Sequence, residues 1–405
     1  MSRSPSPTRR DVARRAGVEP ADVDRLVELG LLHPGADDTY SDADVRRVRW
    51  IRGMERSGVA LDDMAAAVRD GALSFEFLGS SAFDRFAAHS ETTFRELSER
   101  TGVPFELLVV VREATGFARP VADDQVREHE LAIVPAIELQ LAAGFRADVI
   151  EGWLRTSGDS LRRIAETEAE WWKTEVTTPL VEQEGMREGE MLGAQADLGA
   201  RMAPLAEQAI FALYRGQQEH AWSQNAVEYV EAALEGAGLI SRLRRPPAMC
   251  FLDITGYTRL TEERGDEAAA GVATTLATLV RRSSTEHGGQ PVKWLGDGVM
   301  FHFRDPGQGV VSALEMKERV ADHGLPPAHV GLHAGPVVFQ DGDYFGRTVN
   351  IASRIAEHAG PGEVLVSQEV VDASGEAPVT FTPVGPVELK GVSGSLQLHR
   401  VARSG

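Results

Sequence analysis

The sequence predicts an α+β domain at the C-terminal end of the chain, preceded by an all-helical region. From Ala248 onward, short apolar runs with strand character alternate with longer helical patterns. This mixture of hairpins and helical connections predicts a largely antiparallel sheet with helices on one face. From about Leu73 to His220 the chain is rich in Ala, Glu, Leu and Arg, with few strand signals, which favours helices. Pro246 and Pro247 separate the two parts, because proline cannot continue a helix.

Length and composition indicate a soluble chain of several domains. Its residues are 42% hydrophobic and 25% charged, which is typical of globular proteins. Its length of 405 residues is too great for one ordinary core. The formal net charge of −19 disfavours extended binding to nucleic acid or to an anionic membrane. No apolar run reaches the roughly 20 residues that span a bilayer. Cys250 is the one cysteine, so no intramolecular disulfide can form, and a reducing cytoplasm is the expected location. Residues 1–7 lack the apolar core of a secretory signal and are expected to be a disordered lead-in.

Residues 8–72 show short helices joined by tight turns. The stretch DVARRAGVEPADVDRLVELGLL has helical spacing broken at Gly17, and Ser41 can cap the helix that follows. Together with LGLLHPG, these stretches resemble the MerR-type winged-helix family, which places its second helix in the major groove of DNA. Here that helix and the wing are acidic, so DNA binding is disfavoured and a role as sensor or dimer contact is favoured. The carboxylates are Glu19, Asp22, Asp24, Glu28, Asp37 and Asp38.

Residues 73–220 are expected to form a helical regulatory domain, followed by a helical linker over residues 221–246. Its tryptophans are best explained as core or dimer contacts, with an apolar slot for a small-molecule or lipid effector as the alternative. Prolines and glycines that interrupt the helical pattern predict several separate helices. The interrupting residues are Pro104, Gly116, Pro120, Gly144 and Gly158.

Two aspartates lie where apolar strands end. Asp253 comes near the end of AMCFLDI, and Asp297 lies between two glycines in VKWLGDGVMFHF. Alone, Asp253 could cap the following helix and Asp297 could serve a hairpin turn. Together, two strand-end carboxylates in one sheet favour hard, oxygen-preferring cations such as Mg²⁺ or Mn²⁺. Two such cations could bridge phosphate oxygens in an in-line displacement at phosphorus.

Four further polar residues extend this constellation. Lys293 lies four residues before Asp297, about 13 Å away along a strand, so the two are not expected to serve the same end of one ligand. The stretch DGDYFGRTVNIASR supplies Asp343, and then Asn350 and Arg354 on one helical face. Such an Asn/Arg pair suits a ribose and the charge that develops on a phosphate. An exposed helix face is the simpler explanation of the pair taken alone.

The motifs FLDITGYT, VKWLGDGVMF, DYFGRTVNIASR and ELKGV resemble those of the class III nucleotidyl cyclases, in order and spacing, across residues 247–402. The resemblance implies a ferredoxin-like catalytic domain and an adenylate cyclase that converts ATP to 3′,5′-cyclic AMP and pyrophosphate. It implies that Asp253 and Asp297, with the backbone carbonyl of Ile254, hold two Mg²⁺ or Mn²⁺ ions per active site. The remaining roles would fall to Lys293 and Asp343 on the adenine edge, Asn350 on the ribose, Arg354 on the transition state and Lys390 on the terminal phosphates.

That family works as a head-to-tail homodimer, in which one protomer gives the metal aspartates and the other gives the base, ribose and transition-state residues. This arrangement would explain the separation of Lys293 from Asp297. The stretch FELLVVVREATGFARP and the helix before the linker resemble regulatory domains of actinobacterial cyclases. That likeness implies autoinhibition or sensing, with pH or a fatty-acid-like ligand as input. Two alternatives stay open: a guanylate cyclase, and a DNA-binding regulator whose cyclase domain senses nucleotide.

Overall fold

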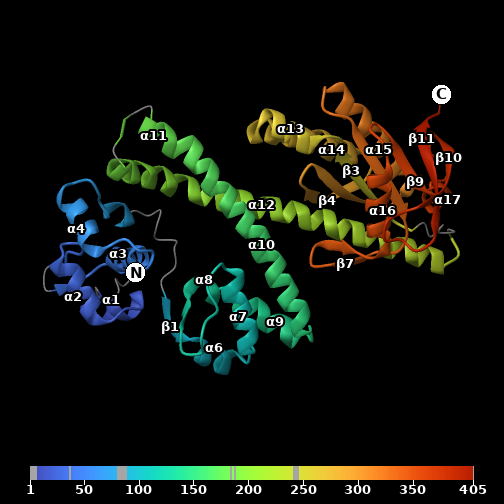
Figure 1. Cartoon of the computed structure of the whole chain (residues 1–405). Helices are drawn as coiled ribbons and strands as arrows, with labels where there is room; N and C mark the ends of the chain where they lie inside the picture. The colour runs from blue at the N-terminus through green and yellow to red at the C-terminus, as the bar shows by residue number, and fades with distance from the viewer. Residues whose placement is uncertain are drawn as a thin grey trace. The chain divides into compact units, whose positions relative to one another are not determined.

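The computed structural model describes residues 7–35, 38–79, 89–182, 185–186, 188–239 and 246–404. The chain divides into two compact units, Met1–Tyr229 and Val230–Gly405, whose elements are labelled in Figure 1. The expected lead-in lies outside the described residues except for Pro7, as do residues 240–245 of the expected linker. Within the described ranges, no helix combines the length and the apolarity needed to cross a membrane.

The first helices of the N-terminal unit share one small core. Thr8 and Ser41 accept hydrogen bonds from the backbone N–H groups of Asp11 and Asp44, and these caps set the starts of α1 and α3. Buried apolar side chains from each helix meet beneath them. The elements are α1 (Arg9–Ala16), α2 (Pro20–Glu28), α3 (Asp42–Arg56), α4 (Leu61–Arg69) and the 3-10 turn η2 (Glu76–Gly79).

The carboxylates of α2 are paired with arginines of the same unit. Asp24 lies 2.7 Å from Arg9, and Asp22 lies 3.3 Å from Arg52. The described residues between α2 and α3 contain no strand, and Asp37 of the expected wing lies outside them. The winged-helix assignment therefore stays a prediction.

The rest of the N-terminal unit is helical apart from one small sheet, in which β1 pairs antiparallel with β2. The sequence had indicated helices only, because these two strands are short and polar. The elements are β1 (His89–Thr93), α6 (Phe94–Thr101), α7 (Phe105–Ala114), β2 (Gln125–Arg127), α8 (Glu128–Leu131), α9 (Val134–Ala142), α10 (Ala147–Trp172), the π-helical turn η3 (Lys173–Thr177), α11 (Thr178–Glu182) and α12 (Glu188–Gly236).

One sequence-based expectation for this region was wrong. Gly158 does not end a helix, because α10 runs through it. A Cβ atom there would lie 2.6 Å from the carbonyl oxygen of Ala114, so the glycine allows α10 to pack closely on the end of α7. Trp153 and Trp222 are exposed, so of the two expected roles, core or dimer contact, only the dimer contact stays a prediction for them.

The C-terminal unit is built on a seven-stranded sheet with the order β10-β11-β9-β6-β3-β5-β4. Every neighbouring pair is antiparallel except β6 and β9. A separate hairpin consists of β7 and β8. The strands are β3 (Ala248–Ile254), β4 (Gly289–Leu295), β5 (Gly298–Phe303), β6 (Ala328–Ala334), β7 (Val338–Gln340), β8 (Asp343–Phe345), β9 (Val364–Ser367), β10 (Val379–Glu388) and β11 (Ser395–Arg403).

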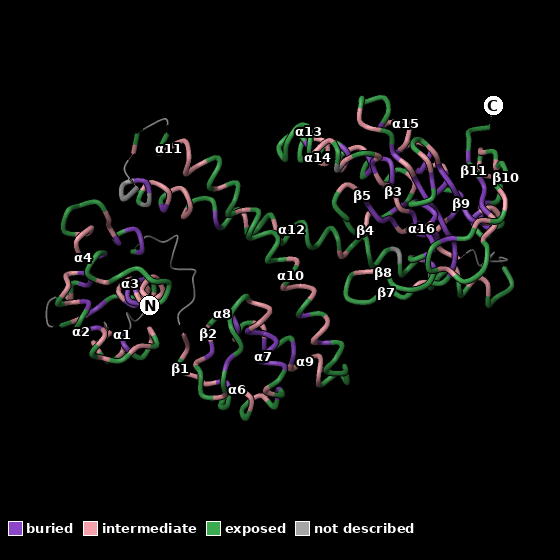
Figure 2. The backbone as a smooth tube through the Cα atoms, in the orientation of Figure 1, coloured by how far each residue is buried: buried purple, intermediate pink, exposed green. Residues whose placement is uncertain are grey.

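Helices cover both faces of this sheet, whereas the sequence predicted helices on one face. Along β3, Cys250 and Leu252 face α14 and α15, while Met249 faces Ala352 of α16. Figure 2 shows the central strands as buried segments. Burial on both faces follows from the continuous apolar run of β3, which has no polar alternation. The helices are α13 (Tyr257–Arg264), α14 (Asp266–Glu286), α15 (Pro306–Asp322), α16 (Arg347–His358) and α17 (Gln368–Ala373).

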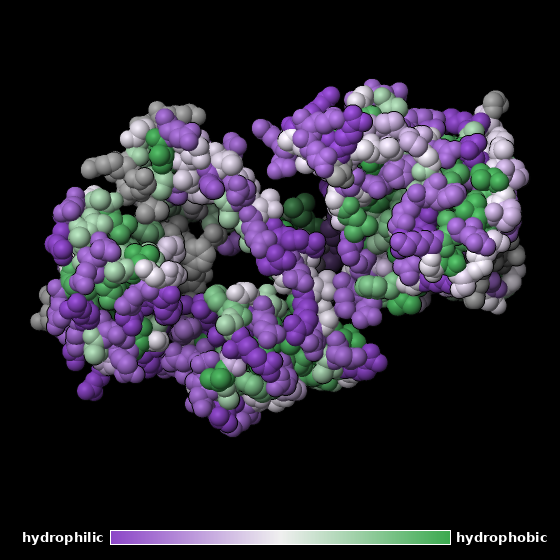
Figure 3. Space-filling model, in the orientation of Figure 1, coloured by the Kyte–Doolittle hydropathy of each residue, from purple (hydrophilic) through white to green (hydrophobic). Residues whose placement is uncertain are grey.

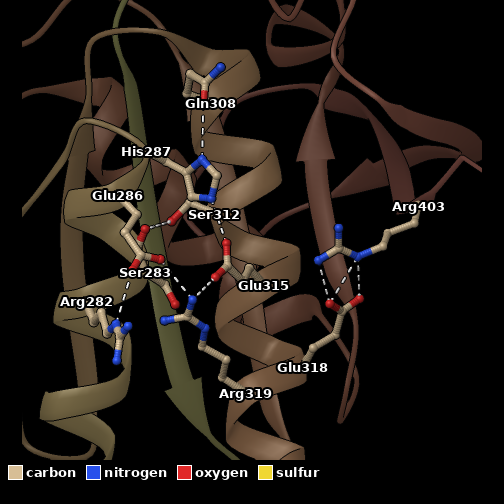
Figure 4. A network of polar contacts seen from close by, with 10 residues as sticks. All are labelled: Arg282, Ser283, Glu286, His287, Gln308, Ser312, Glu315, Glu318, Arg319 and Arg403. Atoms are coloured by element: carbon tan, nitrogen blue, oxygen red, sulfur yellow. Dashed lines mark hydrogen bonds and ion pairs between the residues drawn. The ribbon is translucent and has the colours of Figure 1, made fainter.

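A polar network joins the ends of α14 and α15 on the outer side of the unit (Figure 4). His287 lies 2.6 Å from Glu315, and Arg319 bonds Glu286 at 2.8 Å. Nearby, Arg403 of β11 binds Glu318 of α15 through two guanidinium nitrogens. These contacts hold the two helices together over one face of the sheet.

Gly331 of β6 sets the distance between the sheet and α16. A Cβ atom at this position would lie 2.1 Å from the backbone nitrogen of Ala356. Because that neighbour is helix backbone, it cannot rotate away as a flexible side chain would. The close approach of α16 therefore depends on glycine.

We predict that Gly331→Ala lowers the free energy of unfolding of the C-terminal unit by about 1–3 kcal/mol, the usual cost of overpacking a core. Urea unfolding followed by tryptophan fluorescence measures the change. The matched control is Gly271→Ala in α14, where a Cβ atom would meet nothing within 4 Å. That variant is expected to be neutral or more stable. Equal unfolding midpoints for the two variants would contradict the prediction.

Candidate active site

Two carboxylates meet at one end of the interior strand β3. Asp253 is the last residue but one of β3, and Asp297 lies in the turn between β4 and β5. Strand β5 pairs with β3, so that Leu252 faces Val299 and the turn before β5 reaches Asp253. A Cβ atom on Gly298 would lie 3.2 Å from Oδ1 of Asp253. The absence of a side chain at Gly298 therefore allows the turn to come this close.

The surroundings of Asp253 disfavour its negative charge. Burial raises the pKa of the Asp253 carboxyl, and the nearby charge of Asp297 raises it further. Two groups act in the other direction: the backbone N–H of Ile254 donates to Oδ1 at 2.9 Å, and Nε2 of His329 lies 3.9 Å from Oδ2. Ionised together without a cation, the two aspartates cost stability. A cation between them would remove this cost.

His329 was not found from the sequence. It lies on β6, directly opposite Asp253 in the register of the two strands, and its Nδ1 is 3.1 Å from the hydroxyl of Thr255. The sequence held one usable signal, since His329 is a polar residue inside an apolar strand. Without the strand order, that signal does not point to Asp253.

The donor set suits a hard divalent cation. Asp253 and Asp297 offer carboxylate oxygens, and Ile254, next to Asp253 in the chain, has its side chain buried in the core. Among the described residues, no group of three or more His, Cys, Asp or Glu side chains could enclose a metal ion. Mg²⁺ is commonly held by one or two carboxylates, with waters and substrate phosphates as its other ligands. The residues therefore fit an ion that shares its coordination with a bound phosphate.

Lys293 and Asp343 form a second polar pair. Lys293 lies on β4 and Asp343 begins β8, and their Nζ and Oδ2 atoms are 2.9 Å apart. The backbone N–H of Tyr344 donates to the other oxygen of Asp343 at 2.8 Å, and the Tyr344 ring stacks on His302 with centroids 4.4 Å apart. An exposed ion pair of this kind adds little stability. What it provides is a hydrogen-bond donor and an acceptor side by side at the surface.

Asn350 and Arg354 lie on the side of α16 that faces away from the sheet. Ile351 and Ile355 bury the opposite side of the helix. Nη1 of Arg354 contacts the Glu357 carboxylate at 2.5 Å, and sequence reasoning had not identified this partner. To reach another anion, Arg354 must leave Glu357.

Lys390 is exposed in the loop after β10, beside the buried Leu389. Within the described part of the chain, it makes no hydrogen bond or ion pair. Nor does any such contact join the Asp253–Asp297 pair, the Lys293–Asp343 pair and Arg354 to one another. Within one chain, the structure thus brings Asp253 close to Asp297 and Lys293 close to Asp343. These two pairs and Arg354 stay without direct contact.

We predict that Asp297→Asn raises the melting temperature of the metal-free protein at neutral pH, because it removes a like charge beside Asp253. Added Mn²⁺ should stabilise the wild type and the variant much less. Differential scanning calorimetry with and without Mn²⁺ tests both expectations. The control is Asp322→Asn, which removes one exposed charge at the end of α15. An equal response of wild type and Asp297→Asn to Mn²⁺ would be evidence against a metal site here.

The chain is similar to several known proteins. The family described as "Adenylate and Guanylate cyclase catalytic domain" matches residues 245–402. The "pH-sensitive adenylate cyclase MT1302" of Mycobacterium tuberculosis is 31% identical over 76% of this chain and 77% of its own length. An "Adenylate cyclase" of Streptomyces coelicolor is 30% identical over 67% of this chain and 68% of its own length.

Among solved structures, the adenylyl cyclase CyaB from P. aeruginosa is 23% identical, with a TM-score of 0.36. The match covers 41% of this chain and 98% of that one. The matched family and the long alignments to the two relatives agree with the motifs seen in the sequence. The chain belongs to the class III adenylate and guanylate cyclase family.

Proposed function

We propose that the chain is an adenylate cyclase that converts ATP to 3′,5′-cyclic AMP and pyrophosphate. The ribose 3′-oxygen bonds to the α-phosphorus and loses its proton, while the bond from the α-phosphorus to the oxygen bridging it to the β-phosphate breaks and pyrophosphate leaves. The main support is the approach of Asp297 to Asp253 and the ion pair between Lys293 and Asp343. The relatives that are named adenylate cyclases support the same reaction.

In this proposal, Asp253 and Asp297, with the backbone carbonyl of Ile254, hold two Mg²⁺ or Mn²⁺ ions. Such ions neutralise charge on the phosphate oxygens. Arg354 leaves Glu357 and stabilises the charge that develops at the α-phosphate. Two further assignments complete the site: Asn350 orients the ribose, and Lys390 contacts the terminal phosphates.

The Lys293–Asp343 pair favours adenine over guanine. Lys293 donates to a ring nitrogen, and Asp343 accepts from the 6-amino group. In the same orientation, guanine presents an acceptor at position 6, which would face an acceptor on Asp343. The guanylate cyclase alternative is therefore not favoured.

A homodimer would complete the active site. The hairpin of β4 and β5 directs Asp297 toward Asp253, while Lys293 contacts Asp343. Around Lys293 the surface is apolar: Phe339 is 63% exposed and Phe345 is 50% exposed, with Trp294, Leu295 and Val338 also exposed. Figure 3 shows hydrophobic side chains over the β7–β8 hairpin, which is labelled in Figure 2. Exposed apolar surface of this kind is typical of a protein interface.

Regulation by the N-terminal helical region is a further part of the proposal. The 319-residue similarity to the pH-sensitive relative is too long to be confined to residues 245–402. Glu231, in the last part of α12, belongs to the C-terminal unit and pairs there with Arg304 at 2.5 Å. Autoinhibition, an effector in the helical region and a cytoplasmic location stay predictions. The pairing of Asp22 and Asp24 with arginines gives no support to a DNA-binding regulator.

We predict that the purified chain forms cyclic AMP from ATP with Mn²⁺, and that Asp297→Ala abolishes this activity. Arg354→Ala should lower kcat by about a hundredfold or more, as the loss of one transition-state donor usually does. Chromatography of the products measures both rates and compares ATP with GTP. Unchanged turnover by Asp297→Ala would contradict the metal assignment, and faster turnover of GTP would contradict the base assignment.

We also predict that two inactive variants restore activity when they are mixed. In equal mixtures of Asp297→Ala and Arg354→Ala, half of the dimers are mixed, and each mixed dimer holds one intact site, so about a quarter of wild-type activity should return. The matched control mixes Asp253→Ala with Asp297→Ala, which damage the same half-site. That mixture should stay inactive. No recovery in the first mixture, under conditions where subunits exchange, would contradict a shared site.

A further inference from the structure

The N-terminal unit contains a cavity of about 920 Å³ that is lined by seven arginines. This volume is within the usual range for small-molecule sites. Such a concentration of positive charge is unexpected in a chain with a net charge of −19. It therefore calls for a physical explanation.

One wall of the cavity is a face of α3. Arg46, Arg49, Arg52 and Arg56 line the cavity, at spacings of three and four residues that place them on one side of a helix. The other side of α3 is buried in the core, for example at Val48. Arg52 is paired with Asp22 and Glu55, and Arg46 donates to the carbonyl of Leu78.

The opposite wall comes from the β1–β2 sheet and α7. Arg112 of α7 binds Glu130 and donates to the carbonyl of Gln125 at 2.9 Å. The guanidinium of Arg127 lies 3.6 Å from the ring centre of Phe117. The Nε atom of Arg127 is buried and has no hydrogen-bond partner among the described residues. A buried donor of this kind is costly unless a ligand accepts from it.

Positively charged groups from both walls repel one another. Burial lowers the pKa of Arg127 to about 10, and the charges of Arg49 and Arg112 lower it further. Burial and the same arginines lower the pKa of His89 to about 4, so this histidine is neutral at pH 7. Glu130 is the carboxylate that acts in the opposite direction on Arg127. Three guanidinium groups, those of Arg49, Arg112 and Arg127, therefore lie close enough to repel one another.

The other carboxylates of the lining are already engaged. Asp123 pairs with Arg95 at 2.9 Å, and Asp124 accepts from the backbone N–H of Val121 at 2.8 Å. They hold the loop before β2. Among the described residues, the cavity thus holds Arg127, whose Nε atom has no partner, beside several other guanidinium groups.

We propose that this cavity binds a phosphate-bearing small molecule that carries two or more negative charges. Guanidinium groups bind phosphate oxygens through paired hydrogen bonds. Several guanidinium groups carry more positive charge than one monocarboxylate can neutralise. A concave site formed by two walls suits a small ligand better than the backbone of a DNA duplex. Trp50 also lines the cavity and is 47% exposed, so its ring offers a surface for an organic group attached to the phosphate.

The test is isothermal titration of the full chain with inorganic tripolyphosphate in EDTA, which prevents metal-dependent binding at the catalytic unit. Wild type and Asp297→Ala should bind equally, because the site lies in the N-terminal unit. Arg127→Gln should weaken binding by about tenfold or more, the loss expected for a charge-assisted hydrogen bond. The matched control is Arg162→Gln, an exposed arginine of α10 paired with Glu166, which should bind like wild type.

Thermal melting checks that Arg127→Gln is folded. If its melting temperature is below that of the wild type, Arg127→Lys is tested in its place. Lysine keeps the positive charge but cannot form the paired hydrogen bonds, so this variant should also weaken binding. Equal affinity of wild type and the Arg127 variant would overturn the proposal. So would binding of decanoate in place of tripolyphosphate, or retardation of duplex DNA that is lost in the variant, because these results would assign the arginines to a monocarboxylate or to nucleic acid.

Discussion

Strand β3 is hydrogen-bonded on both sides, to β5 and to β6, and the position of the candidate active site depends on this double pairing. The pairing with β5 brings the turn that carries Asp297 onto Asp253. The pairing with β6 places His329 opposite the same aspartate. The strand can occupy the centre of the sheet because both of its faces are apolar. The two carboxylates are thus brought together by the strand order, against their mutual repulsion.

The same sheet separates the other polar groups from that pair. Strand β4 lies at the edge of the sheet, next to β5, and its Lys293 contacts Asp343 from the β7–β8 hairpin. Helix α16 is held against the sheet at Gly331 and presents Arg354 on its outer side. The sheet keeps each set in its own place, and in the proposed homodimer a second copy would supply the missing half of the site. This geometry favours a catalyst whose activity depends on how two protomers are oriented.

Some of this arrangement was predictable from the sequence. The convergence of Asp253 and Asp297 could be predicted, because both were recognised as carboxylates at strand ends of one sheet. The structure adds that β5, which follows the turn of Asp297, pairs with the strand of Asp253. The family resemblance implied that Lys293 and Asp343 both serve the adenine edge, but their direct contact across 50 residues was not predicted, because no local pattern links them. The roles of Gly158, His329 and Glu357 depend on packing between distant elements. Helices on both faces were missed because an apolar strand does not reveal which helix covers which side.

The arginine-lined cavity shows why net charge is a poor guide to local chemistry. Its arginines come from α1, α3, α7 and β2, and between them lie enough acidic residues to keep the overall balance strongly negative. Folding separates these charges in space: many arginines pair with carboxylates at the surface, while Arg127 and its neighbours face a common cavity. The catalytic unit would hold phosphate through cations bound to its aspartates. The N-terminal unit can hold it directly through guanidinium groups, so one acidic chain has two independent ways to attract the same kind of ligand.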